Sequence, residues 1–127
     1  MRADRMKIFF DGGCRPNPGT METAIVARGV TYHRADCGHG SNNDAEWLAL
    51  IHAVEIAMSI DASDVVMLGD SAMVVAQANG HAPCRAPTFR QYLSDFRQIT
   101  TNFDRIIVRK IPRNQNLAGI ALAATRR

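Results

Sequence analysis

The sequence predicts an α/β fold in which a mixed five-stranded sheet carries helices on both faces. Three apolar segments near the N-terminus are separated by turn residues, which is typical of an antiparallel meander. Long amphipathic segments then alternate with short apolar ones, which indicates βα units and parallel strands. The 127 residues, 46% of them apolar, suit one hydrophobic core. We therefore expect residues 1–127 to form a single domain.

The meander is predicted at residues 6–11, 22–28 and 30–37. The first strand is mostly apolar and ends at the sequence DGG, which predicts a turn after Asp11. The second and third strands are separated at Gly29, so a hairpin is their simplest connection.

A long helix is predicted at residues 44–60, because apolar residues recur there at helical spacing. Asn43 or Asp44 is its expected N-cap. A buried strand at 65–68 leads into a short helix at 72–78, which Asn79-Gly80 ends. A second long amphipathic helix is expected at 88–103. A strand at 105–111 then ends at Pro112, and a short helix without any carboxylate closes the chain.

The charge is divided unevenly along the chain. Residues 1–84 carry a net charge of −4 and residues 85–127 a net charge of +7. Such asymmetry suits a basic face that holds a polyanion beside a separate group of carboxylates. From charge alone, an ordinary solvated basic surface explains the pattern equally well.

Other features narrow the class of protein. The first apolar run is too short for a signal peptide or a membrane span, so we expect a cytoplasmic protein. Three cysteines without CxxC spacing predict no disulfide framework and fit a reducing compartment. His81 and Cys84 lack a second ligand pair nearby in the sequence, so no zinc site is expected.

Three carboxylates stand at the ends of predicted core elements. Asp11 follows the first strand, Glu46 lies in the first turns of the long helix, and Asp70 follows the strand at 65–68. If these two strands are parallel neighbours, Asp11 and Asp70 meet at the centre of the sheet. Carboxylates gathered there repel each other unless a divalent cation is bound. Oxygen ligands without His or thiolate favour Mg²⁺ or Mn²⁺ over zinc.

Ordinary structural roles also explain each carboxylate taken alone. Asp11-Gly12 is a common turn pair, and Glu46 would interact favourably with the helix dipole. Asp70 could cap the helix that follows it. Only the joint pattern of the three favours catalysis.

That joint pattern resembles the type 1 ribonuclease H family. The segment FFDGGCRPNPG resembles its first-strand motif, with Asp11 as the first metal-binding residue. SNNDAE resembles its NNxxE motif, which ends at Glu46, and LGDSAMVV resembles its third motif, with Asp70 and Ser71. The three motifs occur in order with fitting spacing, and the resemblance runs from about Met6 to the C-terminus.

The resemblance implies an RNase H-like fold and an endoribonuclease that cuts the RNA strand of RNA-DNA hybrids. Two Mg²⁺ or Mn²⁺ ions held by Asp11, Glu46 and Asp70 would support the reaction, which leaves a 5′-phosphate and a 3′-hydroxyl. RNA would be distinguished from DNA by its 2′-hydroxyl. We expect low sequence specificity, no membrane association, no obligate protein partner and a monomer. The expected nucleic-acid contacts are Gly12, Cys14, Arg15, Asn17, Asn42, Asn43, Ser71 and Arg113.

The terminal helix departs from the family's pattern. The fourth carboxylate of the family normally lies in an N-x-x-A-D-x-L-A motif, and alignment of that motif on Asn116 places Ile120 at the Asp position. No other acid follows Asp104. Asn116 lies one turn before Ile120 on the same face, so its amide could replace the missing ligand if the helix register shifts. We expect Asn116 to be the fourth catalytic residue, and the alternative is that nothing replaces the acid. Activity should then be reduced or more dependent on metal concentration.

The loop and the substrate grip also differ from the family. The loop IPRNQN carries Arg113 and no His, and Arg113 could contact phosphate without any proton transfer. The basic protrusion of larger members is absent. Substrate grip would then come from scattered cations: Arg15, Arg85, Arg90 and Arg113.

Two other functions fit parts of the sequence. A non-catalytic or weakly active module that binds hybrids or RNA is favoured by the missing fourth acid and the basic face. A serine esterase is suggested by Gly69-Asp70-Ser71, which resembles the GDS block of one hydrolase group. That group places its block near the first strand and needs a late catalytic His, and neither feature is present.

Overall fold

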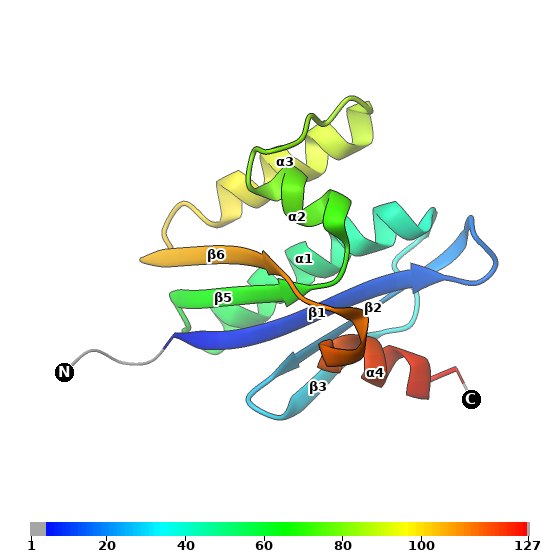
Figure 1. The fold of residues 1–127 in the computed structure, drawn as a ribbon, viewed down its shortest axis with the longest axis horizontal. Coiled ribbons are helices and arrows are strands. Elements are labelled where there is room, and N and C mark those ends of the chain that lie inside the picture. Colours follow the sequence, from blue (N-terminus) through cyan, green and yellow to red (C-terminus); the bar gives the residue numbers. More distant parts are fainter. Residues whose placement is uncertain (1–4, 127) are drawn as a thin grey trace.

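The computed structural model describes residues 5–126, so the expected domain limits at residues 1 and 127 lie outside the described part (Figure 1). A mixed sheet has the strand order β3-β2-β1-β5-β6. The first three strands form the antiparallel meander, and the last two add in parallel. The strands of this path are β1 (Met6–Cys14), β2 (Gly19–Ala27), β3 (Val30–Arg34), β5 (Asp64–Gly69) and β6 (Arg105–Lys110).

The predicted fold class is confirmed, with one added strand. The two-residue strand β4 (His39–Gly40) pairs with the start of β2. A strand of two residues is too short to show the alternation of apolar and polar side chains by which strands are predicted, so the sequence pattern does not reveal β4.

The helices lie in two layers on opposite faces of the sheet (Figure 1). On one face α1 (Asn42–Ser59) crosses β1 and β2, and α2 (Ala72–Ala78) and α3 (Pro87–Ile99) pack beside it. On the other face α4 (Leu117–Ala124), which follows a short 3₁₀ turn, packs against the meander. The terminal helix therefore reaches the centre of the sheet from the side opposite α1.

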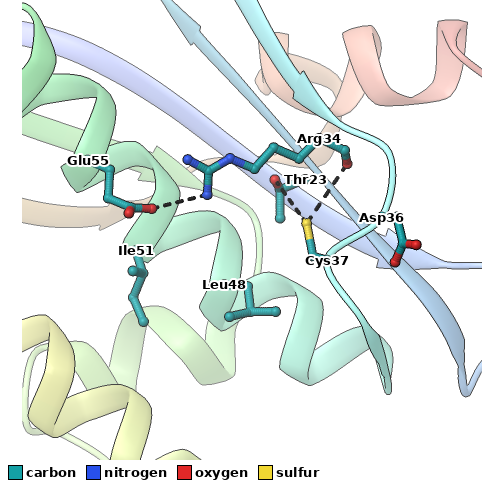
Figure 2. A pocket seen from close by; sticks show the side chains of 7 residues that line it. All are labelled: Thr23, Arg34, Asp36, Cys37, Leu48, Ile51 and Glu55. Carbon is teal, nitrogen blue, oxygen red and sulfur yellow. Dashed lines mark hydrogen bonds and ion pairs between the residues drawn. The ribbon is translucent and has the colours of Figure 1, made fainter.

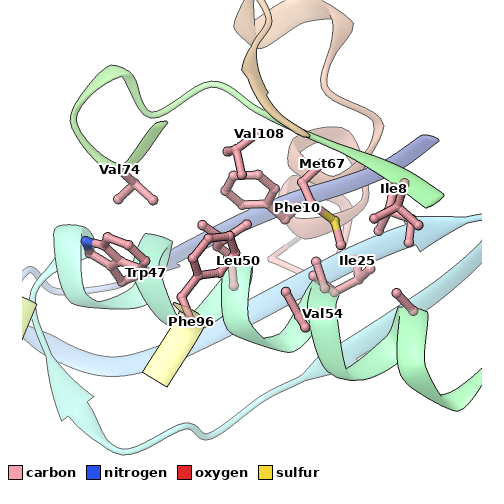
Figure 3. Packing of buried hydrophobic residues seen from close by; sticks show 14 of the residues in the cluster. Ile8, Phe10, Ile25, Trp47, Leu50, Val54, Met67, Val74, Phe96 and Val108 are labelled. Carbon is pink, nitrogen blue, oxygen red and sulfur yellow. The ribbon is translucent and has the colours of Figure 1, made fainter. Parts of the chain in front are cut away.

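The main core fills the space between the sheet and α1 (Figure 3). Ile8 and Phe10 point to this side of β1, because alternate residues of a strand face the same side. Both side chains are fully buried. Trp47 of α1 is also fully buried and lies against the rings of Tyr92 and Phe96 of α3. These contacts fix the position of the first turns of α1.

Two predicted boundaries are wrong near the motif of the first strand. β1 does not turn at Asp11, because Gly12 and Gly13 continue the ladder opposite Thr23 and Glu22. β2 accordingly begins at Gly19 and not at residue 22. The turn signal of DGG is overridden by this pairing.

Several further boundaries differ by a few residues. The N-cap of α1 is Ser41, not Asn43 or Asp44, because Ser41 and Asp44 form a reciprocal capping box. β3 ends at Arg34 and not at residue 37, and α3 ends at Ile99. β6 ends at Lys110, one residue earlier than expected.

In the part of the chain that the structure describes, no helix combines the length and the apolar character needed to cross a membrane. Cys14, Cys37 and Cys84 are free thiols.

Candidate active site

The two central parallel strands part just before the predicted carboxylates. Pairing between β1 and β5 ends at Phe9 and Leu68, and Asp11 and Asp70 each lie two residues beyond this last pair. Glu46 approaches from the first turns of α1. One carboxylate oxygen of each acid lies within 4.8 Å of the others. The cluster therefore occupies the carboxyl end of the parallel strands at the point where the strand order reverses, the usual ligand position in such sheets.

A close approach between β1 and α1 lets Glu46 reach this point. A β-carbon at Gly12 would collide with the backbone carbonyl oxygen of Ala45. The missing side chain leaves room for the Gly12 N–H to donate to Glu46 Oε1 at 2.8 Å. Gly12 thus acts through packing and a backbone donor.

Asn116 contacts the Asp70 carboxylate from the face of the sheet opposite α1. Its Nδ2 donates to Asp70 Oδ2 at 2.9 Å and to the Phe10 carbonyl oxygen at 3.0 Å. Its Oδ1 accepts from the Ala118 N–H and caps α4. The Asn116 oxygen therefore already serves the helix cap, and its predicted role as a replacement metal ligand stays a prediction.

Burial and mutual repulsion raise the pKa values of two of the acids. Burial is the main cause that raises the pKa of Glu46 to about 9, and the neighbouring charge and hydrogen bond of Asp11 add to it. Burial likewise raises the pKa of Asp11 to about 6, assisted by Asp70. Without a cation, both carboxyl groups therefore hold a proton more strongly than usual, and Glu46 more so than Asp11.

This donor set fits a hard divalent cation. The three acids supply only carboxylate oxygens, which Mg²⁺ and Mn²⁺ prefer. A cation among them would supply the opposite charge that the cluster lacks and would replace the proton on Glu46. The site is therefore a candidate centre for divalent metal.

The acids lie in a cleft of about 470 Å³ that collects most of the predicted site residues. Ser71 caps α2 at its edge by accepting from the Val74 N–H. The charge of Arg113 partly offsets the rise in the pKa of Asp11 that burial causes. The predicted residues that line the cleft are Asp11, Gly12, Arg15, Asn42, Asn43, Glu46, Asp70, Ser71 and Arg113.

Three predicted residues do not line the cleft. Cys14 is buried, and its N–H donates to Asn42 Oδ1 at 2.9 Å. Asn17 Oδ1 accepts from the Asn42 N–H at 3.1 Å, which ties the loop after β1 to α1. Asn116 is fully buried behind Asp70. All three support residues that do face the cleft.

Five lining residues were not predicted: Gly13, Gly119, Leu122, Ala123 and Arg126. The three from α4 follow helical spacing after Asn116, which is the one signal that could have found them. Arg126 gave no such signal, because nothing in the sequence places the end of the helix against β2.

The face of α4 toward the acids carries no carboxylate. A β-carbon at Gly119 would stand 3.5 Å from Asp11 Oδ2, while Ile120 in the same turn is 55% exposed. The cluster is therefore built from three acids among the described residues, as the sequence predicted.

A second cavity of about 310 Å³ lies between α1 and the segment after β3 (Figure 2). Arg34 Nη1 and Glu55 Oε1 form an ion pair at 3.1 Å in the lining of this cavity, and Cys37 also lines it. Its acids among the described residues are Asp36 and Glu55, and they do not belong to the group of three that could hold a metal.

Comparisons with known proteins match nearly the whole chain. The model of the family described as "Reverse transcriptase-like" matches residues 9–125. A protein of Halobacterium salinarum named "Ribonuclease HI" is 33% identical over 96% of this chain. The chain spans 64% of that protein and 34% of "Bifunctional protein Rv2228c" of Mycobacterium tuberculosis, to which it is 29% identical.

Solved structures agree with these matches. The crystal structure of RNase H1 from Halobacterium salinarum superposes with a TM-score of 0.87 at 30% identity and covers 94% of each chain. LC11-RNase H1 in complex with an RNA/DNA hybrid gives a TM-score of 0.81 at 29% identity and covers 93% of each chain.

Proposed function

The chain belongs to the type 1 ribonuclease H family, and from this membership we propose that it is a metal-dependent endoribonuclease that hydrolyses the RNA strand of RNA-DNA hybrids. The observation that carries the proposal is the convergence of Asp11, Glu46 and Asp70 within 4.8 Å. We further propose one RNase H-like domain over residues 1–127 that acts as a monomer in the cytoplasm. The free thiols support only the last of these points, because they fit a reducing compartment.

Two Mg²⁺ or Mn²⁺ ions are the proposed cofactors, held by Asp11, Glu46 and Asp70. When bound, they would activate the attacking water and stabilise the leaving 3′ oxygen. The protein's own contribution is to fix the carboxylates in place. Gly12 holds Glu46 through its N–H, and Asn116 holds Asp70 through its amide nitrogen. Partners of this kind orient the groups that bind metal and stabilise their ionised form.

The residues around the acids suit a nucleic-acid backbone. Asn42 lines the cleft and accepts from the Cys14 N–H with its oxygen, so its amide nitrogen is the end we assign as a donor to substrate. Asn43 and Asn42 could thus bind the 2′-hydroxyls that distinguish RNA from DNA. Arg15 and Arg113 add positive charge for phosphates.

A second candidate is a hybrid-binding module with little or no catalysis. The observation that favours it is the first turn of α4, where Gly119 faces Asp11 and no acid is available. This module would keep the basic contacts of the cleft but would cut no RNA with either ion.

Cleavage assays with a panel of substrates separate the two candidates. We expect wild-type protein to cut the labelled RNA strand of a hybrid with Mg²⁺ or Mn²⁺, leaving 5′-phosphate ends, and not to cut the DNA strand. Asp11→Asn should lower the rate roughly 100-fold or more, because it removes a central metal ligand. Asp61→Asn is the matched control, since this exposed residue has a positive φ that Asn tolerates. Equal rates for the two variants would overturn the proposed site.

A further inference from the structure

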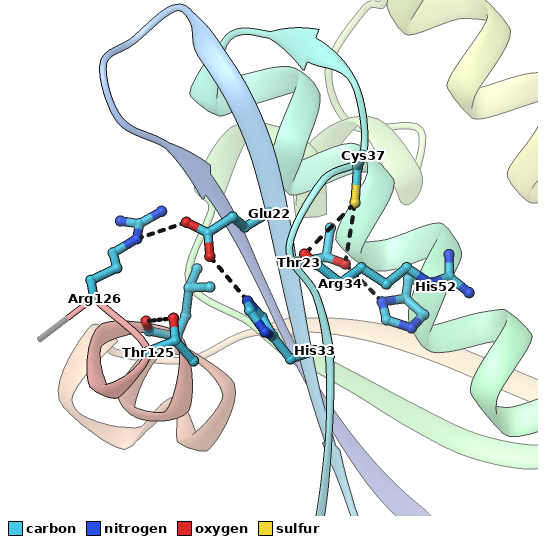
Figure 4. Close-up of polar contacts among 9 residues, drawn as sticks. Glu22, Thr23, His33, Arg34, Cys37, His52, Thr125 and Arg126 are labelled. Carbon is cyan, nitrogen blue, oxygen red and sulfur yellow. Dashed lines mark hydrogen bonds and ion pairs between the residues drawn. The ribbon is translucent and has the colours of Figure 1, made fainter.

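Arg126 lies in the turn after α4, and its side chain reaches back into the cleft beside the acids. Figure 4 shows its guanidinium group beside Glu22 in the first half of β2. Glu22 is the β-sheet partner of Gly13, which also lines the cleft. The last turn of the described chain therefore brings a cation to the border of the proposed active site.

A pair of contacts fixes this cation. Arg126 Nε donates to Glu22 Oε1 at 3.2 Å, and the other oxygen of Glu22 lies 3.0 Å from His33 Nε2 (Figure 4). The side chains of Arg126 and Glu22 are only 19% and 20% exposed. Because Nε is engaged, the guanidinium keeps a set orientation and its two terminal nitrogens remain for another partner.

One of those terminal nitrogens lacks a partner. Nη2 of Arg126 is buried and is the one buried side-chain polar atom among residues 5–126 that makes no hydrogen bond. It lies over Gly13, 3.1 Å from where a β-carbon would stand. Burial of a charged donor without a hydrogen-bond partner destabilises the folded protein. An acceptor oxygen from a bound molecule would remove this cost, and the described residues supply none.

We propose that Arg126 binds a backbone phosphate of the nucleic acid held in the cleft. This inference rests on the proposed function and adds a specific contact to it. A phosphate carries several acceptor oxygens, and guanidinium binds it in a planar, charge-assisted arrangement. To reach the phosphate, the guanidinium would exchange the orientation set by Glu22 for one in which Nη2 turns from Gly13 toward the cleft. The contact would hold the substrate on the β2 side of the acids, away from Arg113.

Hybrid binding as a function of salt tests the contact directly. All variants are made in an Asp11→Asn background, which blocks cleavage, and binding of a fluorescent hybrid is followed by anisotropy in Mn²⁺. We expect Arg126→Ala to weaken binding roughly five- to twentyfold and to lower the salt slope by about one, the signature of one lost phosphate contact. Arg126→Lys should keep most of the salt slope. Arg97→Ala is the matched control, because Arg97 is exposed on α3 and does not line the cleft.

A purely structural role for Arg126 predicts a different result. If the ion pair only fastened the end of α4, Glu22→Gln and Arg126→Ala would weaken binding and lower Tm to the same extent. We expect Glu22→Gln to keep the salt slope, because the cation remains. In cleavage assays on protein with Asp11 intact, Arg126→Ala should raise KM with little change in kcat, as expected for a binding contact.

Two outcomes separate failure of the inference from failure of the proposed function. If the Asp11→Asn protein binds no hybrid, both are wrong. If it binds hybrid but Arg126→Ala matches Arg97→Ala in affinity and salt slope, only the role of Arg126 is wrong.

Discussion

At the scale of the residue, Glu46 shows how the fold prepares a cation site. It reaches between two parting strands and accepts from the Gly12 N–H, yet burial and two neighbouring acids disfavour its charge. A carboxyl group held in this way stays protonated until a positive charge arrives. Metal binding and proton release are therefore linked at this residue.

Proton release during metal binding checks this link. Because the pKa of Glu46 is about 9 and that of Asp11 about 6 without metal, Mn²⁺ should displace about one proton at pH 7. Affinity should then rise up to about tenfold per pH unit between pH 7 and 9. Calorimetry in two buffers of different ionisation enthalpy measures the proton. Glu46→Gln should abolish it and the exposed control Glu55→Gln should keep it, whereas release from both or from neither contradicts the assignment.

Asn116 is a second residue whose role the geometry changes. It caps α4 with its oxygen and holds Asp70 and the Phe10 carbonyl with its nitrogen. We expect Asn116→Ala to lower the free energy of unfolding by about 2–3 kcal/mol, from the lost cap and the unpaired carbonyl. Urea denaturation measures the loss, with the exposed Asn114→Ala as control.

Asn116→Asp separates the positioning role from the cap. An Asp keeps the cap but removes the donor to Asp70 and places an acid beside it. We expect lower kcat and a higher Mn²⁺ requirement than in the wild type. A variant with more activity at low metal would instead make this position a metal ligand.

Sequence reasoning identified the three acids because each belongs to a motif of local residues. It placed Asn116 near them but did not show that its nitrogen holds Asp70 while its oxygen caps α4, since tertiary contacts decide how the two ends of an amide are used. Arg126 was missed for the same reason. Its partner Glu22 is 104 positions away in the chain.

At the scale of the element, α1 joins the site to the core through a buried histidine. His52 is 3% exposed, and its Nδ1 lies 2.8 Å from Thr23 Oγ1 of β2 (Figure 4). Burial lowers the pKa of His52 to about 4, and Arg34 adds to the effect. The helix therefore docks on the sheet with a neutral imidazole.

This histidine predicts a loss of stability in acid. Between pH 6.5 and 4 the unfolded chain binds a proton that the folded His52 does not, so stability falls as pH decreases. From pH 7 to pH 5, His52 should lower the free energy of unfolding by about 2 kcal/mol. Urea denaturation of wild type and His52→Gln at both pH values measures it, and the difference between the proteins isolates this residue. The same pH dependence in both would contradict the low pKa.

The first turn of α4 is the element where a fourth acid is missing. Ile120 directly follows Gly119, whose β-carbon position lies 3.5 Å from Asp11 Oδ2, and it is 55% exposed. An acid there would disturb no packing and would interact favourably with the helix N-terminus. We expect Ile120→Asp to raise cleavage at low metal concentration. Leu117→Asp is the matched control, since Leu117 is an exposed apolar residue of the same turn. Equal metal dependence of the two variants would show that the carboxylate does not reach the site.

The elements themselves were predicted well where apolar periodicity is long. The errors lie at ends, where a competing contact decides the boundary. Ser41 takes the N-cap of α1 because Asp44 completes the capping box, and β1 passes through DGG because β2 pairs with it. The ends of helices and strands thus depend on contacts with residues that the local sequence pattern does not reveal.

At the scale of the whole molecule, the strand order creates the site. β1 lies between an antiparallel and a parallel neighbour, and its parting from β5 leaves the space that the three acids share. α1 brings Glu46 from one face, and α4 brings Asn116 and Arg126 from the other. The sequence predicted the meeting of Asp11 with Asp70, but the approach from two faces required the structure.

The central claim is that three carboxylates and divalent metal suffice to cut the RNA strand of a hybrid. Single-turnover cleavage of a labelled hybrid, followed over a Mn²⁺ titration for wild type and Asp70→Asn, tests it most directly. We predict a saturable, metal-dependent rate for wild type and a loss of roughly 100-fold or more for Asp70→Asn. A wild-type protein that binds the hybrid and cuts it at no metal concentration would contradict the claim.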